Sequence, residues 1–211
     1  MDDSIERDVT DPLDRGEAAL VLSPSFIGDR RTTCLDLLAV GESSHDRVLF
    51  ITFTNALDDL LDGWEDQFER PPGRIAFVSV DADSRSTAFD SSTPETEHHD
   101  EVDITVDRVQ SPGNLTKFGV RITNRLEALD DIHESTGIVT CFDSITALLQ
   151  YVEVEEAFRF LHVITDRLAD VGATSHFHMD PSAHDDETVD TLVTLFDALY
   201  EYDDGTLMKS K

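Results

Sequence analysis

The 211-residue chain contains 45 acidic and 16 basic residues, which give it a formal net charge of −29 at pH 7. Such a charge repels itself at ordinary ionic strength, but molar salt shortens the Debye length to about 3 Å, so the composition predicts a halophilic protein from a salt-filled cytoplasm. It excludes electrostatic binding to nucleic acid or to an anionic membrane surface, because both need clustered Lys and Arg.

The chain is expected to form one α/β domain with short polar ends. Residues 1–16 are acidic and predict a flexible segment, residues 17–202 carry the periodic apolar pattern of a folded domain, and residues 203–211 predict a tail or a terminal strand. The sequence contains no export leader and no apolar run of about 20 residues, which predicts a cytoplasmic protein without a membrane span.

Short apolar runs alternate with amphipathic stretches along this domain. Strand patterns occupy 18–22, 48–53, 75–80, 102–106, 137–142 and 173–179, and helical patterns occupy 30–40, 56–67, 114–129, 153–171 and 186–195. The polar stretch 84–101 has no periodicity and is expected to be an exposed loop. The alternation predicts an α/β fold of three layers, αβα, with helices on both faces of a mostly parallel sheet.

The two cysteines, Cys34 and Cys141, both have apolar neighbours in the sequence. A disulfide framework or a zinc ribbon needs more cysteines or closer spacing. We therefore expect both residues to be thiols of the core.

The turn after the first predicted strand has the context of a phosphate-binding loop. However, Ser25 stands where that motif has its first glycine, Arg30 where it has its second, and Arg31 where it has its lysine. A long side chain at such a glycine position obstructs the approach of backbone to phosphate. If nucleotide binding is retained, the candidate residues of this loop are Ser25, Gly28, Arg31, Thr32 and Thr33.

The run 137–142 ends at Asp143 and Ser144, as does the strand whose carboxylate contacts nucleotide-bound magnesium. With this pair and the apolar helix start that follows, the chain resembles the RecA/KaiC superfamily of nucleoside-triphosphatases over residues 17–202. It is similar in more detail to a haloarchaeal group of uncharacterised RecA/KaiC-like domains, through the stretches Asn114-Leu115-Thr116, Cys141-Phe142-Asp143-Ser144 and His176-Phe177-His178-Met179-Asp180-Pro181.

The resemblance implies a P-loop NTPase fold with a degenerate Walker A loop, in which Asp143 and Ser144 would face any bound ATP and Mg²⁺. In that superfamily a glutamate after the second strand commonly activates the attacking water, but residues 52–55 read Thr-Phe-Thr-Asn. The phosphate loop and this carboxylate both depart from the pattern. ATP and Mg²⁺ are therefore not favoured as cofactors, and no catalytic residue is assigned.

A second kind of site is suggested near the last predicted strand. His176, His178 and Asp180 alternate along that strand and so share a face, and His184 follows shortly after. Imidazole and carboxylate donors suit zinc or another divalent metal. The favoured alternative is that the histidines are half-buried and hydrogen-bonded to neighbours, and that the turn at Pro181 directs His184 elsewhere.

Three functions remain open from the sequence. The preferred one is a non-hydrolysing RecA/KaiC-like domain that acts in regulation or signalling through a protein partner. The alternatives are a divergent ATP-binding protein or ATPase that uses the loop 23–33 and Asp143, and a metal-dependent enzyme built on His176 and His178. The sequence does not identify the partner, and it leaves a homo-oligomer open.

Overall fold

In the computed structural model of the chain, the described residues are 13–24, 34–35, 37, 47–53, 57–67, 72–80, 95–99, 102–111, 113–131, 137–203 and 206–210. The strands are β1 (Ala18–Leu22), β2 (Arg47–Thr52), β3 (Arg74–Val80), β4 (Glu95–His99), β5 (Val102–Val109), β6 (Ile138–Asp143), β7 (Thr174–Met179), β8 (Ala198–Asp203) and β9 (Thr206–Lys209). The helices are α2 (Leu57–Gln67), α3 (Leu115–Asp130), α4 (Ile145–Leu148), α5 (Val154–Asp170) and α6 (Asp186–Val193). Of the predicted helix 30–40, only residues 34, 35 and 37 are described, and these are helical.

The described strands form one nine-stranded sheet in the order β4-β5-β3-β2-β6-β7-β1-β8-β9. The inner pairs are parallel, and only the outermost pairs, β4 with β5 and β8 with β9, are antiparallel. Strands β1 and β2 are buried along their whole length, as expected where both faces of a parallel sheet are covered. The predicted α/β fold with three layers and a mostly parallel sheet is confirmed.

The structure at the two edges of the sheet differs from one prediction, the loop at 84–101, and settles the conformation of the C-terminal residues. Residues Glu95–His99, expected to belong to an exposed loop at 84–101, form β4 and pair with β5. An edge strand is held by backbone hydrogen bonds to one neighbour, so its side chains need not alternate between apolar and polar. At the other edge, residues 203–211 were expected to form a tail or a terminal strand, and Thr206–Lys209 form the strand β9, which pairs with β8.

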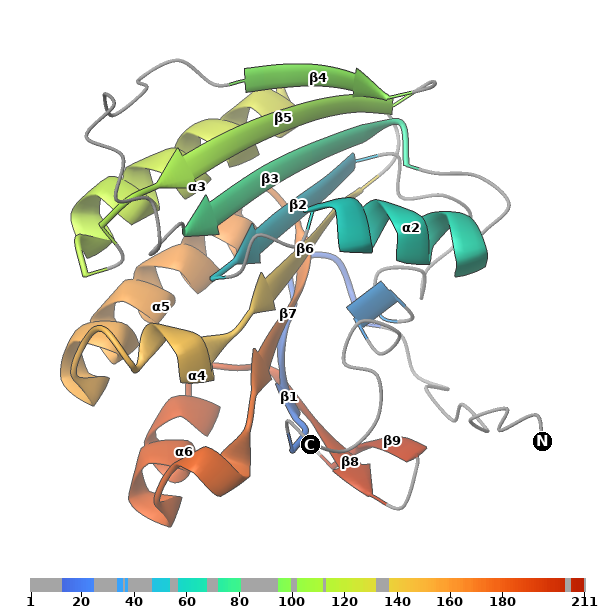
Figure 1. The fold of residues 1–211 in the computed structure, drawn as a ribbon. Helices are drawn as coiled ribbons and strands as arrows, with labels where there is room; N and C mark the ends of the chain where they lie inside the picture. The colour runs from blue at the N-terminus through green and yellow to red at the C-terminus, as the bar shows by residue number, and fades with distance from the viewer. Residues whose placement is uncertain are drawn as a thin grey trace.

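The helices divide unequally between the two faces of the sheet. Helix α2 covers one face, here called the α2 face, and α3 to α6 cover the other, the α3/α5 face (Figure 1). The helix α3 begins where it was expected, because the side chain of Asn114 accepts a hydrogen bond of 3.1 Å from the backbone N–H of Lys117. No helix in the described ranges is long and apolar enough to cross a membrane.

The apolar packing also differs between the faces. The α3/α5 face holds one large core, in which Phe118 and Phe160 stack at 5.5 Å and Phe142 and Phe177 stack at 5.2 Å. The α2 face holds two smaller clusters. One lies under α2 and includes Phe50, Phe77 and Trp64, and the other gathers residues of β1, β8 and β9, among them Ala19, Val21 and Tyr200.

Candidate functional site

The candidate residues for nucleotide binding are only partly placed. Ser25, Gly28, Arg31, Thr32 and Thr33 lie outside the described residues. Asp143 is the half-buried last residue of β6, and the Ser144 hydroxyl caps α4 by accepting a hydrogen bond of 3.1 Å from Ala147 N–H. These two residues therefore lie at the carboxyl end of a central strand, where ligands of parallel sheets bind.

The first residue after β2 is Phe53, which belongs to the stretch 52–55 where the resemblance to the RecA/KaiC superfamily would place an activating glutamate. Phe53 is 9 % exposed and lies 5.5 Å from Phe118, 5.9 Å from Phe142 and 6.2 Å from Tyr151 between ring centroids. Edge-to-face and stacked rings at these separations attract one another in addition to excluding water. The end of β2 thus contributes to the core of the α3/α5 face.

The four residues predicted as metal ligands fall into two groups. Asp180 accepts hydrogen bonds from the backbone N–H and the hydroxyl of Ser182, at 2.9 and 2.6 Å, and so caps the turn that follows β7. His184 Nε2 lies 3.2 Å from Thr146 Oγ1, which also accepts a hydrogen bond from Asp180 N–H. Pro181 begins the turn that takes His184 away from the strand, so Asp180 and His184 do not join His176 and His178.

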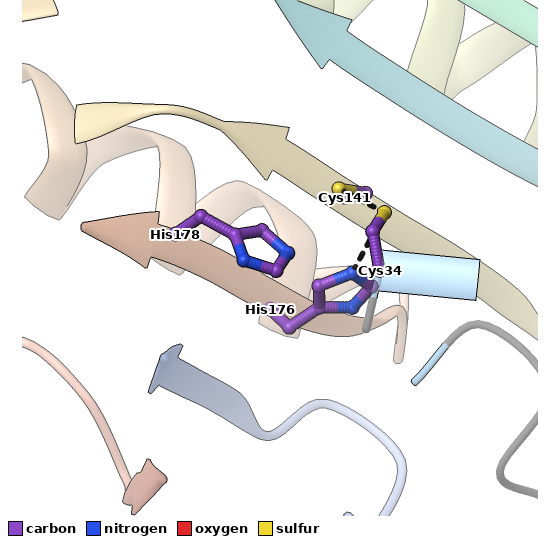
Figure 2. A group of neighbouring side chains, drawn as sticks. All are labelled: Cys34, Cys141, His176 and His178. Atoms are coloured by element: carbon purple, nitrogen blue, oxygen red, sulfur yellow. Dashed lines mark hydrogen bonds between the residues drawn. The ribbon is translucent and has the colours of Figure 1, made fainter. Parts of the chain in front are cut away.

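His176 and His178 instead meet the two cysteines. Cys34, Cys141, His176 and His178 are all buried, and one ligand atom from each lies within 4.8 Å of all the others. We call this group the Cys/His cluster (Figure 2). Cys34 Sγ lies 2.7 Å from Cys141 Sγ and 3.5 Å from His176 Nε2, and the two imidazole centroids are 5.1 Å apart.

The strands of the sheet determine this convergence. Cys141 on β6 is the direct register partner of His176 on β7, and parallel register partners point to the same face. His178 is two residues further along β7 and shares that face. Cys34, in a helical position on the α2 face, completes the group from above the sheet (Figure 2).

Burial sets the protonation state of the first histidine. Burial, and then the neighbouring His178, hold the pKa of His176 well below its ordinary value of 6.5. At neutral pH the His176 imidazole is therefore neutral. A neutral imidazole is the form that coordinates a metal.

The sequence did not predict that Cys34 and Cys141 would lie beside the two histidines. Both thiols are buried, as expected, but they are not merely apolar fillers of the core. Cys34 is 107 residues from Cys141 and 142 residues from His176. Ligands separated in this way leave no short motif, because the register of β6 and β7 brings Cys141 to the histidines and the packing of a helical position on the sheet adds Cys34.

A groove lies on the opposite side of the molecule, between α3 and α5. It has a volume of about 550 Å³, and its lining includes Val120 and Val163, whose exposed fractions are 53 % and 59 %. Arg159 and Arg167 also line it, with side chains 73 % and 59 % exposed. Glu156 lines the groove as well, and the two arginines lie 3.4 Å from Glu155 and 3.9 Å from Asp170, respectively.

Comparisons with known proteins identify a family. A family model described as a family of unknown function (DUF7504) matches residues 16–202. The chain is also similar to a solved structure from Pyrococcus horikoshii OT3, described as a structural study of Project ID PH0250, with a TM-score of 0.58 and 11 % identity over 94 % of this chain and 88 % of that one. Likeness at this identity shows a shared fold alone, and no curated protein matches. Because the family model spans most of the sequence, the chain belongs to this family of unknown function, DUF7504.

Proposed function

We propose that the chain is a non-hydrolysing RecA/KaiC-like domain that acts in regulation by holding a partner protein in the groove between α3 and α5. The observation that carries this proposal is the pairing of exposed apolar side chains, Val120 and Val163, with exposed arginines in one groove. Residues 115–126 of α3 include no acidic residue, although the chain has 45 of them. The α3 side of the groove therefore has no acidic residue, whereas the α5 side contains Glu156 besides the two arginines.

The chemistry of the groove favours one occupant, an amphipathic helix with acidic residues beside an apolar stripe. Apolar side chains of the helix would cover Val120 and Val163. Its carboxylates would share Arg159 and Arg167 with Glu155 and Asp170, which lie 3.4 and 3.9 Å from these arginines on α5. A second copy of the chain fits less well, because an isologous contact between two such grooves brings arginines of like charge together.

The absence of hydrolysis is inferred from the end of β2. Phe53 packs there against Phe118 and Phe142, and the stretch 52–55, which matches the place of the superfamily's glutamate, contains no carboxylate. Without a carboxylate there to activate water, in-line attack on a phosphoryl group loses a main contribution to its rate. A nucleotide-binding role is the second candidate, because Asp143 lies at the carboxyl end of β6 beside its register partner Thr52.

The interaction is tested with a synthetic amphipathic helical peptide that carries a leucine stripe and glutamates, titrated by fluorescence anisotropy in KCl. We expect Val163→Asp to weaken binding by tenfold or more, since it buries an unpaired charge in the contact, by about 1.4 kcal/mol or more. Met208→Asp is the matched control, because Met208 is a 50 % exposed apolar residue on the distant strand β9. Equal binding by both variants, or equal binding of a scrambled peptide, would contradict the proposal.

Hydrolysis and nucleotide binding are tested separately on the same protein. We expect no magnesium-dependent ATP hydrolysis above that of a heat-killed sample. Turnover that Asp143→Asn abolishes would contradict the non-hydrolysing role. Calorimetric titration with ATP, ADP and GTP tests the nucleotide-binding role. The absence of any heat of binding would exclude that role.

A further inference from the structure

We infer that the Cys/His cluster is a structural zinc site that ties the segment around Cys34 to the centre of the sheet. The inference rests on four observations about the cluster: its donor set, its spacing, its burial and its position between two apolar clusters. It does not depend on the partner proposed above.

The donor set matches zinc by chemical type. Two cysteine sulfurs and two imidazole nitrogens form the Cys₂His₂ combination of structural zinc sites. Thiolate donors disfavour magnesium and calcium, which prefer oxygen ligands. The carboxylate of Asp180, which would have suited those ions, is engaged with Ser182 instead.

The four ligand atoms lie within 4.8 Å of one another, so the donors must move to reach the spacing of a tetrahedral ion. With Zn–S near 2.3 Å and Zn–N near 2.0–2.1 Å, tetrahedral donors lie about 3.3–3.8 Å apart. The 3.5 Å between Cys34 Sγ and His176 Nε2 falls in this range, and the 2.7 Å between the two Sγ atoms must widen by about 1 Å. Smaller χ1 rotations shared between the two cysteines can separate the Sγ atoms by that amount while the backbone stays in place. The same 2.7 Å exceeds the about 2.05 Å of a disulfide.

The position of the cluster shows what a metal would join. Strand β7 lies between β6 and β1, so on the α2 face His176 and His178 separate the apolar cluster that contains Cys141 from the one that contains Ala19 and Val21. His176 is 2 % exposed and His178 is 1 % exposed. Coordination by zinc would bind both imidazoles and link the two clusters through one centre.

The number of ligands defines the role of the ion. Four protein donors complete the tetrahedral shell, whereas catalytic zinc sites have three protein ligands and leave a position for water or substrate. All four residues are also buried away from solvent. The site is therefore assigned to folding and stability, in place of the metal-dependent enzyme considered from the sequence.

The test is the zinc content of untagged protein purified in molar KCl. We expect about one zinc per chain in the wild type and less than about a tenth in Cys34→Ser and in His178→Ala. His184→Ala and His162→Ala are matched controls that should keep their zinc. The first removes a histidine near the end of β7, and the second removes an exposed histidine of α5. Zinc below a tenth of an equivalent in the wild type would overturn the inference.

A second measurement keeps the inference testable if the variants do not fold. Wild-type protein stripped by a chelator is titrated with Co²⁺, and we expect thiolate-to-cobalt charge-transfer absorption that saturates at one equivalent and that Zn²⁺ abolishes. Cobalt binding without the charge-transfer band would overturn the assignment of the cysteines. A metal-free protein whose intact mass is lower by two hydrogens, which reports a disulfide between Cys34 and Cys141, would overturn the metal site itself.

Discussion

The two faces of the sheet are stabilised in different ways, although they share the same strands. On the α3/α5 face, β7 contributes Phe177 and Met179 to one continuous apolar core. On the α2 face, the alternate residues of the same strand are His176 and His178, and the apolar packing is divided into two smaller clusters. One strand can therefore contribute apolar side chains to one face and polar side chains to the other, because alternate side chains point to opposite faces.

The division also explains where a metal contributes most. A large aromatic core supplies its own burial energy, and an ion would add little to it. Two small clusters separated by buried imidazoles gain more from a centre that connects them. The zinc inferred above is therefore expected on the α2 face, where packing alone is weaker.

Salt is expected to have the largest effect, because it acts on both faces together. As KCl falls from molar to about 0.1 M, the Debye length grows from about 3 Å to about 10 Å, and repulsion among 45 acidic residues reaches more neighbours. This change in salt should lower the melting temperature more than the substitutions Phe118→Ala and Asp185→Ala, which are described below. Thermal melts followed by circular dichroism across a KCl series measure it. A melting temperature independent of KCl would show that the acidic surface does not set stability.

The next largest effect is expected from opening the aromatic core of the α3/α5 face. Phe118 is fully buried and contacts Phe53, Phe142 and Phe160. Phe118→Ala should lower the free energy of unfolding by about 3–5 kcal/mol, through lost burial and the cavity that remains. Val120→Ala on the same helix is the control and should change it by less than about 0.5 kcal/mol, since Val120 is 53 % exposed.

Denaturant unfolding at constant KCl measures both variants, and zinc content measures what they do to the other face. If the two faces are stabilised separately, Phe118→Ala keeps its zinc while it loses stability. A variant that loses zinc in proportion to stability would show instead that the two faces unfold as one inseparable unit.

Most of the fold could be predicted from the sequence because its elements have strong periodic patterns. The buried strands β1 and β2 are continuous apolar runs, and α5 has an apolar stripe along its whole length. The strand β4 was missed because its sequence, Glu-Thr-Glu-His-His, carries no apolar alternation. Its pairing with β5 is made by the backbone, which a side-chain pattern does not report.

The sequence predicted the histidines of the candidate site but not its cysteines. Alternation along a strand correctly places His176 and His178 on one face, but it extends to Asp180 only if the strand continues, and Pro181 begins a turn there. Cys141 joins the histidines through strand order, since β7 lies beside β6 although α4 and α5 separate the two strands in the chain, and Cys34 joins them by packing on the sheet from a helical position. Strand order is a tertiary property, and single-residue patterns do not contain it.

The smallest expected effect concerns a helix cap on the α3/α5 face, outside both the aromatic core and the Cys/His cluster. The Asp185 carboxylate caps α6 by accepting a hydrogen bond of 2.8 Å from Thr188 N–H, and hydrogen bonding to Thr188 lowers the pKa of Asp185 below 3.8. A carboxylate with a lowered pKa adds stability above its unfolded-state pKa, and that contribution is lost as the pH falls through the lower folded-state value. Asp185→Ala should therefore lower the melting temperature slightly at neutral pH, and the difference from wild type should shrink once the pH falls below 3.8.

Asp185→Asn is the control, because its amide oxygen still caps the helix but does not titrate. Thermal melts of the three proteins at fixed KCl across this pH range measure the effect, and a difference between wild type and Asp185→Ala that persists unchanged in acid would show that the charge of Asp185 does not contribute to the cap.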